Sequence, residues 1–167
     1  MKKTILCTCL TCLILACGTT EKVNNDVVSD LNLDRYLGTW YEIARFDHRF
    51  ERGMEQTKAS YSLQEDGTVK VVNSGIKDGK GRIAVGKGKL TDTPALLRVS
   101  FFGPFYADYR VMLLDRDYRY ALVGSGGSKY LWILSRTPQL PEGAKEILLE
   151  EAAHRGYAVE NLIWVKH

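Results

Sequence analysis

The sequence predicts an all-β fold, namely an eight-stranded antiparallel up-and-down β-barrel with one C-terminal helix and a short ninth strand. From Leu37 onward apolar and polar residues alternate, and turn residues interrupt the alternation about every ten positions, which is typical of a sandwich or barrel. The connections are short, which favours antiparallel neighbours in chain order. Helical spacing of apolar residues appears only after residue 140. Eight strands in this arrangement leave room inside the barrel for one small ligand.

Eight strands are expected before the spacing changes. Glu65-Asp66-Gly67 has the composition of a hairpin turn and divides the second strand from the third. Gly103-Pro104 divides the fifth strand from the sixth, and the glycine and serine residues of 124–128 precede the eighth. The expected strand ranges are 39–45, 56–63, 69–74, 83–90, 96–102, 106–114, 118–123 and 130–135.

The C-terminal helix is predicted from a change of period. Pro141-Glu142-Gly143 opens a segment whose apolar residues fall on one helical stripe. These residues are Ala144, Ile147, Leu148 and Ala152. Gly156 takes the position of a C-terminal cap. A last strand is expected over 159–165.

The first residues have the layout of a bacterial secretory signal. Met1-Lys2-Lys3 is basic, and the apolar run that follows has about 12 residues, against the ~20 that a membrane-spanning helix needs. The run ends in Ile14-Leu15-Ala16-Cys17-Gly18, which resembles the processing motif of lipoproteins. The resemblance implies cleavage before Cys17, acylation of its sulfur and sorting to the outer membrane. An ordinary secretory signal with incidental cysteines is the alternative.

The expected organisation follows from these two parts of the chain. Residues 1–16 are the signal peptide, residues 17–32 are the lipidated cysteine and a flexible tether, and residues 33–167 are the barrel domain. The tether is inferred because residues 19–30 are mostly polar and show no period. We expect lipid anchoring at the outer membrane, with the periplasmic face favoured over the cell surface.

Charge and cysteine usage exclude several classes of function. The chain has 23 basic and 20 acidic residues, and Lys2 and Lys3 lie in the segment expected to be removed. The remainder is close to neutral, which argues against nucleic acid as a partner because such binding needs a basic face. All four cysteines precede Gly18, so the mature domain has no disulfide, thiolate ligand or thiol nucleophile.

Three landmarks resemble the signatures of the lipocalin family. Gly38-x-Trp40 opens the first expected strand, Asp117-Tyr118 follows the sixth, and Arg136 ends the eighth. The resemblance implies that Trp40 plugs the closed end of the barrel and that the Arg136 side chain lies across it. Gly38, Trp40, Tyr118 and Arg136 are therefore expected to stabilise the fold and not to contact ligand.

Two longer segments resemble one branch of the lipocalins. Residues 99–106 and 130–138 are similar to the outer-membrane lipoprotein lipocalins of bacteria, which are relatives of apolipoprotein D. The mature chain departs from many secreted animal lipocalins in having no disulfide, so packing alone must stabilise it.

The interior follows from strand alternation, because side chains two residues apart share a face. If Trp40 points inward, Glu42 and Ala44 do too, and the same count can be made on every strand. The expected ligand-binding residues are Glu42, Ala59, Tyr61, Val71, Leu97, Val99, Phe101, Tyr109, Val111, Leu113, Tyr120, Leu122, Trp132 and Leu134. Such a lining suits a ligand that is mostly hydrocarbon with one polar end. The alternative is a barrel that these side chains fill.

The open end should lie opposite Trp40, at the long loop of residues 47–54 and the loops on the same side. Phe50, Met54, Phe102, Phe105 and Tyr106 would form an apolar rim. His48, Arg49 and Arg52 could meet a carboxylate or phosphate headgroup, although each charge taken singly is more typical of a solvated loop.

The sequence favours a carrier over an enzyme. It contains no Ser-His-Asp, paired-carboxylate or phosphate-binding motif, and no cofactor or metal is expected. We expect a membrane-anchored protein that stores or transports fatty acids or lysophospholipids, in outer-membrane maintenance or stress. The alternatives are a lipocalin-fold enzyme and a structural lipoprotein with a filled barrel. A homodimer is left open.

Overall fold

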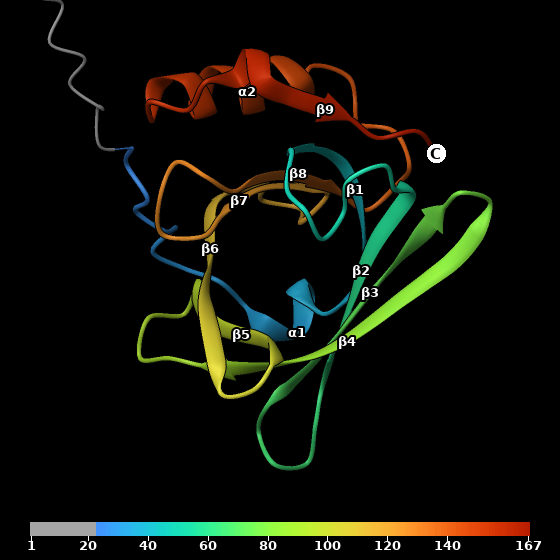
Figure 1. The fold of residues 1–167 in the computed structure, drawn as a ribbon. Helices are drawn as coiled ribbons and strands as arrows, with labels where there is room; N and C mark the ends of the chain where they lie inside the picture. Colours follow the sequence, from blue (N-terminus) through green and yellow to red (C-terminus); the bar gives the residue numbers. More distant parts are fainter. Residues whose placement is uncertain (1–22) are drawn as a thin grey trace, which may run out of the picture.

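The computed structural model describes residues 23–167, so the expected signal peptide and Cys17 lie outside the described residues. Within residues 23–167, nine strands form one antiparallel sheet in the order β2-β3-β4-β5-β6-β7-β8-β1-β9, and a further pairing of β1 with β2 closes it into a barrel (Figure 1). The strands are β1 (Gly38–Phe46), β2 (Glu55–Leu63), β3 (Val69–Lys77), β4 (Lys80–Leu90), β5 (Leu96–Phe102), β6 (Phe105–Leu114), β7 (Tyr120–Gly124), β8 (Leu131–Ser135) and β9 (Leu162–Trp164). The predicted barrel, helix and ninth strand are confirmed.

Turn residues move some boundaries from those expected. Asp78 and Gly79 both have positive φ, 52° and 69°, and join β3 to β4 in a two-residue turn, so both strands are longer than predicted. Tyr118 has φ 61° and lies in a turn, so β7 begins two residues later than expected. The final segment begins with the 3-10 helix η1 (Val159–Asn161), which leaves only three residues for β9.

Two β-bulges change which side chains face the interior. One lies between Glu42 and Ala44 in the β1–β8 ladder, and the other lies between Val111 and Leu113 in the β6–β7 ladder. A bulge adds one residue to one strand, so every later side chain on that strand changes face. Ala44 therefore lies outside the barrel, contrary to the strict alternation expected for β1.

The apolar residues form two separate cores. The inner cluster lies inside the barrel and contains Trp40. The outer cluster lies between the barrel wall and helix α2 (Ala144–His154), which covers one side of the barrel (Figure 1). The helix buries Ala144, Leu148 and Ala152 against β7, β8 and β1, whereas Ile147 of the predicted stripe is 47% exposed. Gly156, with φ 86°, follows the helix as expected of a cap.

The segment before the barrel has a fixed place from Val23 onward. Val23 is buried in the outer cluster, the Val28 amide donates to the Val111 carbonyl, and the Arg155 guanidinium donates to the Asp26 carbonyl. The expectation of a flexible tether is therefore wrong for residues 23–32. The few apolar residues of this mostly polar segment are enough to pack it against the barrel. The short helix α1 (Leu33–Tyr36) follows, capped by Asn32, and was not expected.

Candidate ligand-binding site

The closed end of the barrel is built as the family resemblance implied. Trp40 is fully buried, its indole N–H donates to the Tyr36 carbonyl, and the Arg136 guanidinium lies 3.9 Å from its ring centroid. Arg136 also donates to the Tyr118 and Thr39 carbonyls. A Cβ at residue 38, where φ is 91°, would stand 3.4 Å from the Arg136 guanidinium, so glycine suits that position.

Most of the predicted lining residues do face the interior. The inner cluster contains Ala59, Tyr61, Val71, Leu97, Val99, Phe101, Tyr109, Val111, Trp132 and Leu134. Glu42 joins them through Thr57, whose hydroxyl donates to its carboxylate. Contact of these residues with a ligand stays a prediction.

Three predicted lining residues lie on the other face of the wall. Leu113, Tyr120 and Leu122 belong to the outer cluster under α2, so their assignment to the interior is wrong. The bulge after Val111 reverses the face of Leu113. On β7 the inward residues are Ala121 and Val123, because the turn at Tyr118 sets the phase of that strand opposite to the one assumed.

Solvent reaches the interior from the end opposite Trp40. Val99, Phe101, Tyr109 and Trp132 point inward and are partly exposed, whereas the inward residues Tyr61, Val71, Leu97 and Val111 are buried. Ala59, the cross-strand partner of Trp40, is also partly exposed. The accessible part of the wall is therefore the part nearest the loops that follow β1, β3, β5 and β7. This gradient is expected of a cavity that is closed at one end and open at the other.

A buried polar cluster lies near the open end. Arg45 is 2% exposed; it donates to the Glu42 carboxylate at 2.6 Å and to the Glu51 and Met54 carbonyls. Glu51 Oε2 accepts from the Trp132 indole at 3.2 Å and lies 2.8 Å from His48 Nε2. Arg45 thus fastens the loop of residues 47–54 to the inner wall.

The two carboxyl groups of this cluster have different proton affinities. Burial, together with the nearby Glu51 carboxylate, raises the pKa of Glu42 to about 8, although Arg45 opposes the shift. Burial also acts to raise the pKa of Glu51, but the hydrogen bonds from His48 and Trp132 and the positive charges of His48 and Arg45 together lower it overall. At neutral pH the arrangement therefore favours a protonated Glu42 and an ionised Glu51 beside Arg45.

Sequence reasoning missed Arg45 and Glu51 and did not expect His48 to be buried. Arg45 stands three residues after Glu42, which in a regular strand is the opposite face. His48 was expected in a solvated loop, yet it is buried between Phe50, Tyr130 and Trp132, with ring centroids 5.5–6.1 Å away. No local pattern signals the bulge, so these positions could not be found from spacing.

The rim of the open end is aromatic, as expected. Phe50, Phe102 and Phe105 are 53%, 68% and 78% exposed, and the rings of Phe50 and Phe102 are 6.3 Å apart. Arg52 is paired with Asp47 at 2.6 Å and lies on the surface. The rim therefore offers apolar surface at the entrance.

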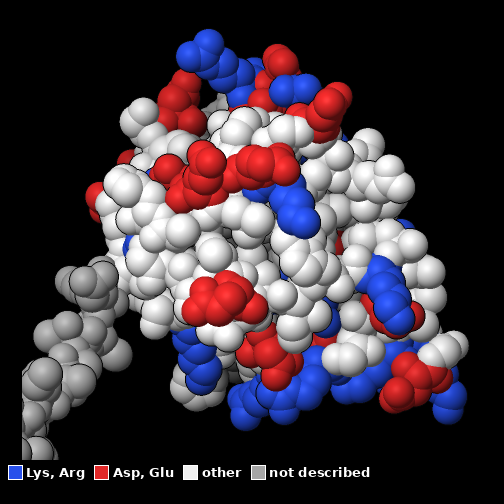
Figure 2. Space-filling model, turned by 90° about the horizontal axis from the view of Figure 1, so that it is seen from above, with Lys and Arg blue, Asp and Glu red and all other residues white. Residues whose placement is uncertain are grey.

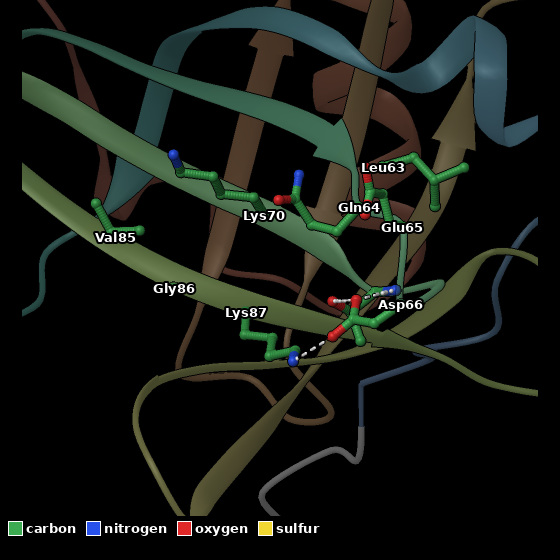
Figure 3. A pocket seen from close by; sticks show the side chains of 9 residues that line it. Leu63, Gln64, Glu65, Asp66, Lys70, Val85, Gly86 and Lys87 are labelled. Carbon is green, nitrogen blue, oxygen red and sulfur yellow. Dashed lines mark hydrogen bonds and ion pairs between the residues drawn. The ribbon is translucent and has the colours of Figure 1, made fainter.

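A separate hollow of about 590 Å³ lies outside the barrel at the β2–β3 hairpin (Figure 3). Its lining includes Lys70, Val85 and Lys87, and Lys87 lies 2.8 Å from Asp66. None of the inner-wall side chains named above contributes to it. We therefore place the candidate site inside the barrel and not in this hollow.

Neither surface charge nor a metal-binding cluster marks a second site among the described residues. Seen from the α2 side, acidic and basic side chains are interspersed on a mostly uncharged face (Figure 2). Among residues 23–167, no group of three His, Cys, Asp or Glu side chains could hold a metal ion. No helix in the same range is long and apolar enough to cross a membrane.

The fold and these landmarks agree with a comparison to known families. A family model described as a lipocalin-like domain matches residues 31–167. The chain belongs to the lipocalin family. This lipocalin is 48% identical over 159 residues to the outer membrane lipoprotein Blc of Escherichia coli K12, covering 92% of this chain and 90% of the relative. It is 44% identical over 144 residues to the protein of the same name in Vibrio cholerae, covering 83% and 84%.

More distant relatives have the same architecture. Apolipoprotein D of Mus musculus is 33% identical over 147 residues, which cover 81% of this chain and 77% of the relative. The solved structure of insecticyanin from the tobacco hornworm superposes with a TM-score of 0.71 at 22% identity, covering 85% of each chain. Lobster apocrustacyanin A1 gives a TM-score of 0.68 at 20% identity, covering 81% of this chain and 79% of that one. These two structures support the fold alone.

Proposed function

We propose that this lipocalin is a lipid-anchored protein of the outer membrane that carries fatty acids or lysophospholipids, with the acyl chain inside the barrel. The observation that supports this most is the apolar inner wall, which is partly exposed toward one end and closed by Trp40 at the other. Burial of hydrocarbon contributes ~0.8 kcal/mol per methylene, so about ten methylenes offset the several kcal/mol that association costs.

The polar end of the ligand would lie at the Arg45 cluster. Arg45 Nε and His48 Nδ1 are buried and have no hydrogen-bond partner within residues 23–167, and an oxygen of a headgroup inserted beside them would satisfy both. The aromatic rim of Phe50 and Phe102 would contact the first carbons of the chain. The same geometry supports a non-catalytic carrier, since Arg45, Glu42, Glu51 and His48 contact one another or the loop of residues 47–54.

Anchoring is proposed through Cys17, with a role in outer-membrane maintenance or stress and the periplasmic face favoured. The relatives named outer membrane lipoprotein support the location. Radiolabelled palmitate should label the wild-type protein and not a Cys17→Ser variant. A wild-type protein that takes up no label would contradict the anchoring.

Self-association is a separate part of the proposal. Ile83 and Val85 on the outer face of β4 are 75% and 56% exposed and are the apolar residues that a second copy would cover. Sedimentation of wild type and Val85→Lys would show whether a homodimer exists and whether it uses this face.

Native extraction followed by lipid mass spectrometry tests the carrier function. The expected result is co-purification of lipids with a single acyl chain in a ratio near one per protein. Extraction of the folded protein without lipid, and failure to take up added fatty acid, would favour the structural lipoprotein with a filled barrel.

A further inference from the structure

Three tyrosine hydroxyls meet at the floor of the accessible interior. Tyr36 comes from α1, Tyr61 from β2 and Tyr109 from β6. The Tyr61 hydroxyl donates to the Tyr109 oxygen at 2.9 Å, and the Tyr36 and Tyr109 oxygens are 2.7 Å apart. The Tyr36 ring also packs on Trp40, with centroids 4.9 Å apart. We call these three residues the tyrosine triad.

The three hydroxyl protons of the triad outnumber the two hydrogen bonds among its oxygens, so one proton has no acceptor among them. Three hydroxyls carry three protons, and two hydrogen bonds consume two of them. Within residues 23–167 no other group accepts from these oxygens, so the free proton belongs to Tyr36 or Tyr109, depending on the direction of the bond between them. Burial raises the pKa of all three hydroxyls, so they remain donors at physiological pH. A buried donor without an acceptor is unfavourable.

The free donor lies beside the space where an acyl chain would end. Tyr36 and Tyr61 are buried, whereas Tyr109 is partly exposed toward the interior. Leu97 lies directly opposite Tyr109 and is buried, as is Val111 toward the closed end, whereas Val99, toward the open end, is partly exposed. The Tyr109 hydroxyl therefore marks the point at which the accessible interior changes from apolar wall to a polar floor.

We propose that the triad donates a hydrogen bond to an oxygen atom near the inner end of the bound lipid, so that the barrel accepts acyl chains with a hydroxyl or keto group toward the methyl end. This inference rests on the proposed function. A neutral oxygen fits because the triad contains only neutral groups, and a charged carboxylate buried there would lose its hydration without gaining a cation. The headgroup accordingly stays at the Arg45 cluster.

The test compares stearate with a series of hydroxystearates whose hydroxyl is placed progressively closer to the methyl end. Each acid displaces a fluorescent fatty acid from wild type, from Tyr109→Phe and from Tyr36→Phe. The measured quantity is the ratio of the two dissociation constants, hydroxystearate over stearate, for each protein. In Tyr109→Phe the ligand hydroxyl loses its partner, which should shift this ratio against the hydroxystearate by about threefold to tenfold.

The matched control is Tyr41→Phe, which removes a hydroxyl from the outer cluster on the far side of the wall. It should leave the ratio at the wild-type value. Near-ultraviolet circular dichroism checks that each variant is folded. Tyr36→Phe leaves the Tyr109 hydroxyl with no protein acceptor within residues 23–167, so it should not shift the ratio against the hydroxystearate.

The outcomes separate this inference from the function on which it rests. If stearate binds wild type but the ratio is the same in wild type and Tyr109→Phe at every hydroxyl position, or if Tyr36→Phe shifts the ratio against the hydroxystearate as strongly as Tyr109→Phe, the role of the triad is overturned and the carrier function stands. If neither stearate nor any hydroxystearate binds wild type, the carrier function itself fails. A shift against the hydroxystearate in Tyr109→Phe, but not in Tyr36→Phe or Tyr41→Phe, supports the inference.

Discussion

Arg45 donates a 2.6 Å hydrogen bond to Glu42, although residues three apart on a regular strand lie on opposite faces. The β-bulge between Glu42 and Ala44 brings both side chains to the inside of the barrel. The other terminal nitrogen of the Arg45 guanidinium donates to two backbone carbonyls of the loop of residues 47–54. One irregular step in β1 thus joins the inner wall to the loop at the barrel entrance.

Removing Arg45 should destabilise the fold. Arg45→Met removes the guanidinium that donates to the buried Glu42 carboxyl group and to the Glu51 and Met54 carbonyls, and breaking a buried pair in this way costs about 3–5 kcal/mol. Urea denaturation measures the loss. The control is Lys58→Met, an exposed residue on β2, which should change the free energy of unfolding by less than about 0.5 kcal/mol. If both substitutions changed the free energy of unfolding equally, Arg45 would not stabilise the fold.

The raised pKa of Glu42 predicts a pH dependence of stability. Because the folded pKa, about 8, lies above the ordinary value of 4.5, the unfolded chain releases this proton more easily. The free energy of unfolding should therefore fall as pH rises from 4.5 to about 8 and level off above that. Glu51, whose pKa is lowered, acts in the opposite sense, and its contribution is lost as pH falls through its folded pKa.

Glu42→Gln isolates the first effect, since glutamine has the same shape and does not titrate. Urea denaturation at a series of pH values should give a flatter dependence for Glu42→Gln than for wild type over that range. The same slope in both proteins would place the titrating group elsewhere.

Trp40 and Arg136 should behave as one structural unit. Trp40→Ala removes a fully buried indole and should cost about 3–5 kcal/mol. A double-mutant cycle with Arg136→Ala should show a coupling of at least about 0.5 kcal/mol, because the guanidinium lies 3.9 Å from the indole centroid. Additive losses would mean that the observed stacking contributes nothing to stability.

The face of Leu122 can be tested in the same way. Leu122→Ala opens a cavity in the outer cluster and should cost about 2–5 kcal/mol while leaving fatty-acid affinity unchanged. Leu97→Ala, in the inner cluster, should alter both stability and affinity. An affinity change in Leu122→Ala as large as that in Leu97→Ala would contradict the outward placement.

The sequence predicted the barrel because its strands alternate and its turns carry glycine, aspartate and proline. The signature residues Trp40 and Arg136 were predicted from the family resemblance, and the structure places them in contact. The phase of individual strands was less predictable. Each bulge shifts the alternation by one residue, so Leu113 was assigned to the wrong face and Arg45 was missed.

Long-range contacts explain the other differences. His48 is buried because Trp132 and Tyr130 approach it from β8 and the loop before it, more than 80 residues away in the chain. The tyrosine triad likewise joins α1, β2 and β6, and the short α1 carried no strong signal of its own. Such clusters depend on tertiary packing and cannot be found from spacing along one segment.

The central claim, a ligand-binding interior, is tested most directly by placing the same charge on the two faces of the wall. Val99 is partly exposed on the inner face, and Val85 is exposed on the outer face. Titration with a fluorescent fatty acid should show at least a tenfold loss of affinity in Val99→Arg and wild-type affinity in Val85→Arg, since a buried methylene chain contributes most of the binding energy. Equal binding by wild type and Val99→Arg, or binding by neither, would contradict the account.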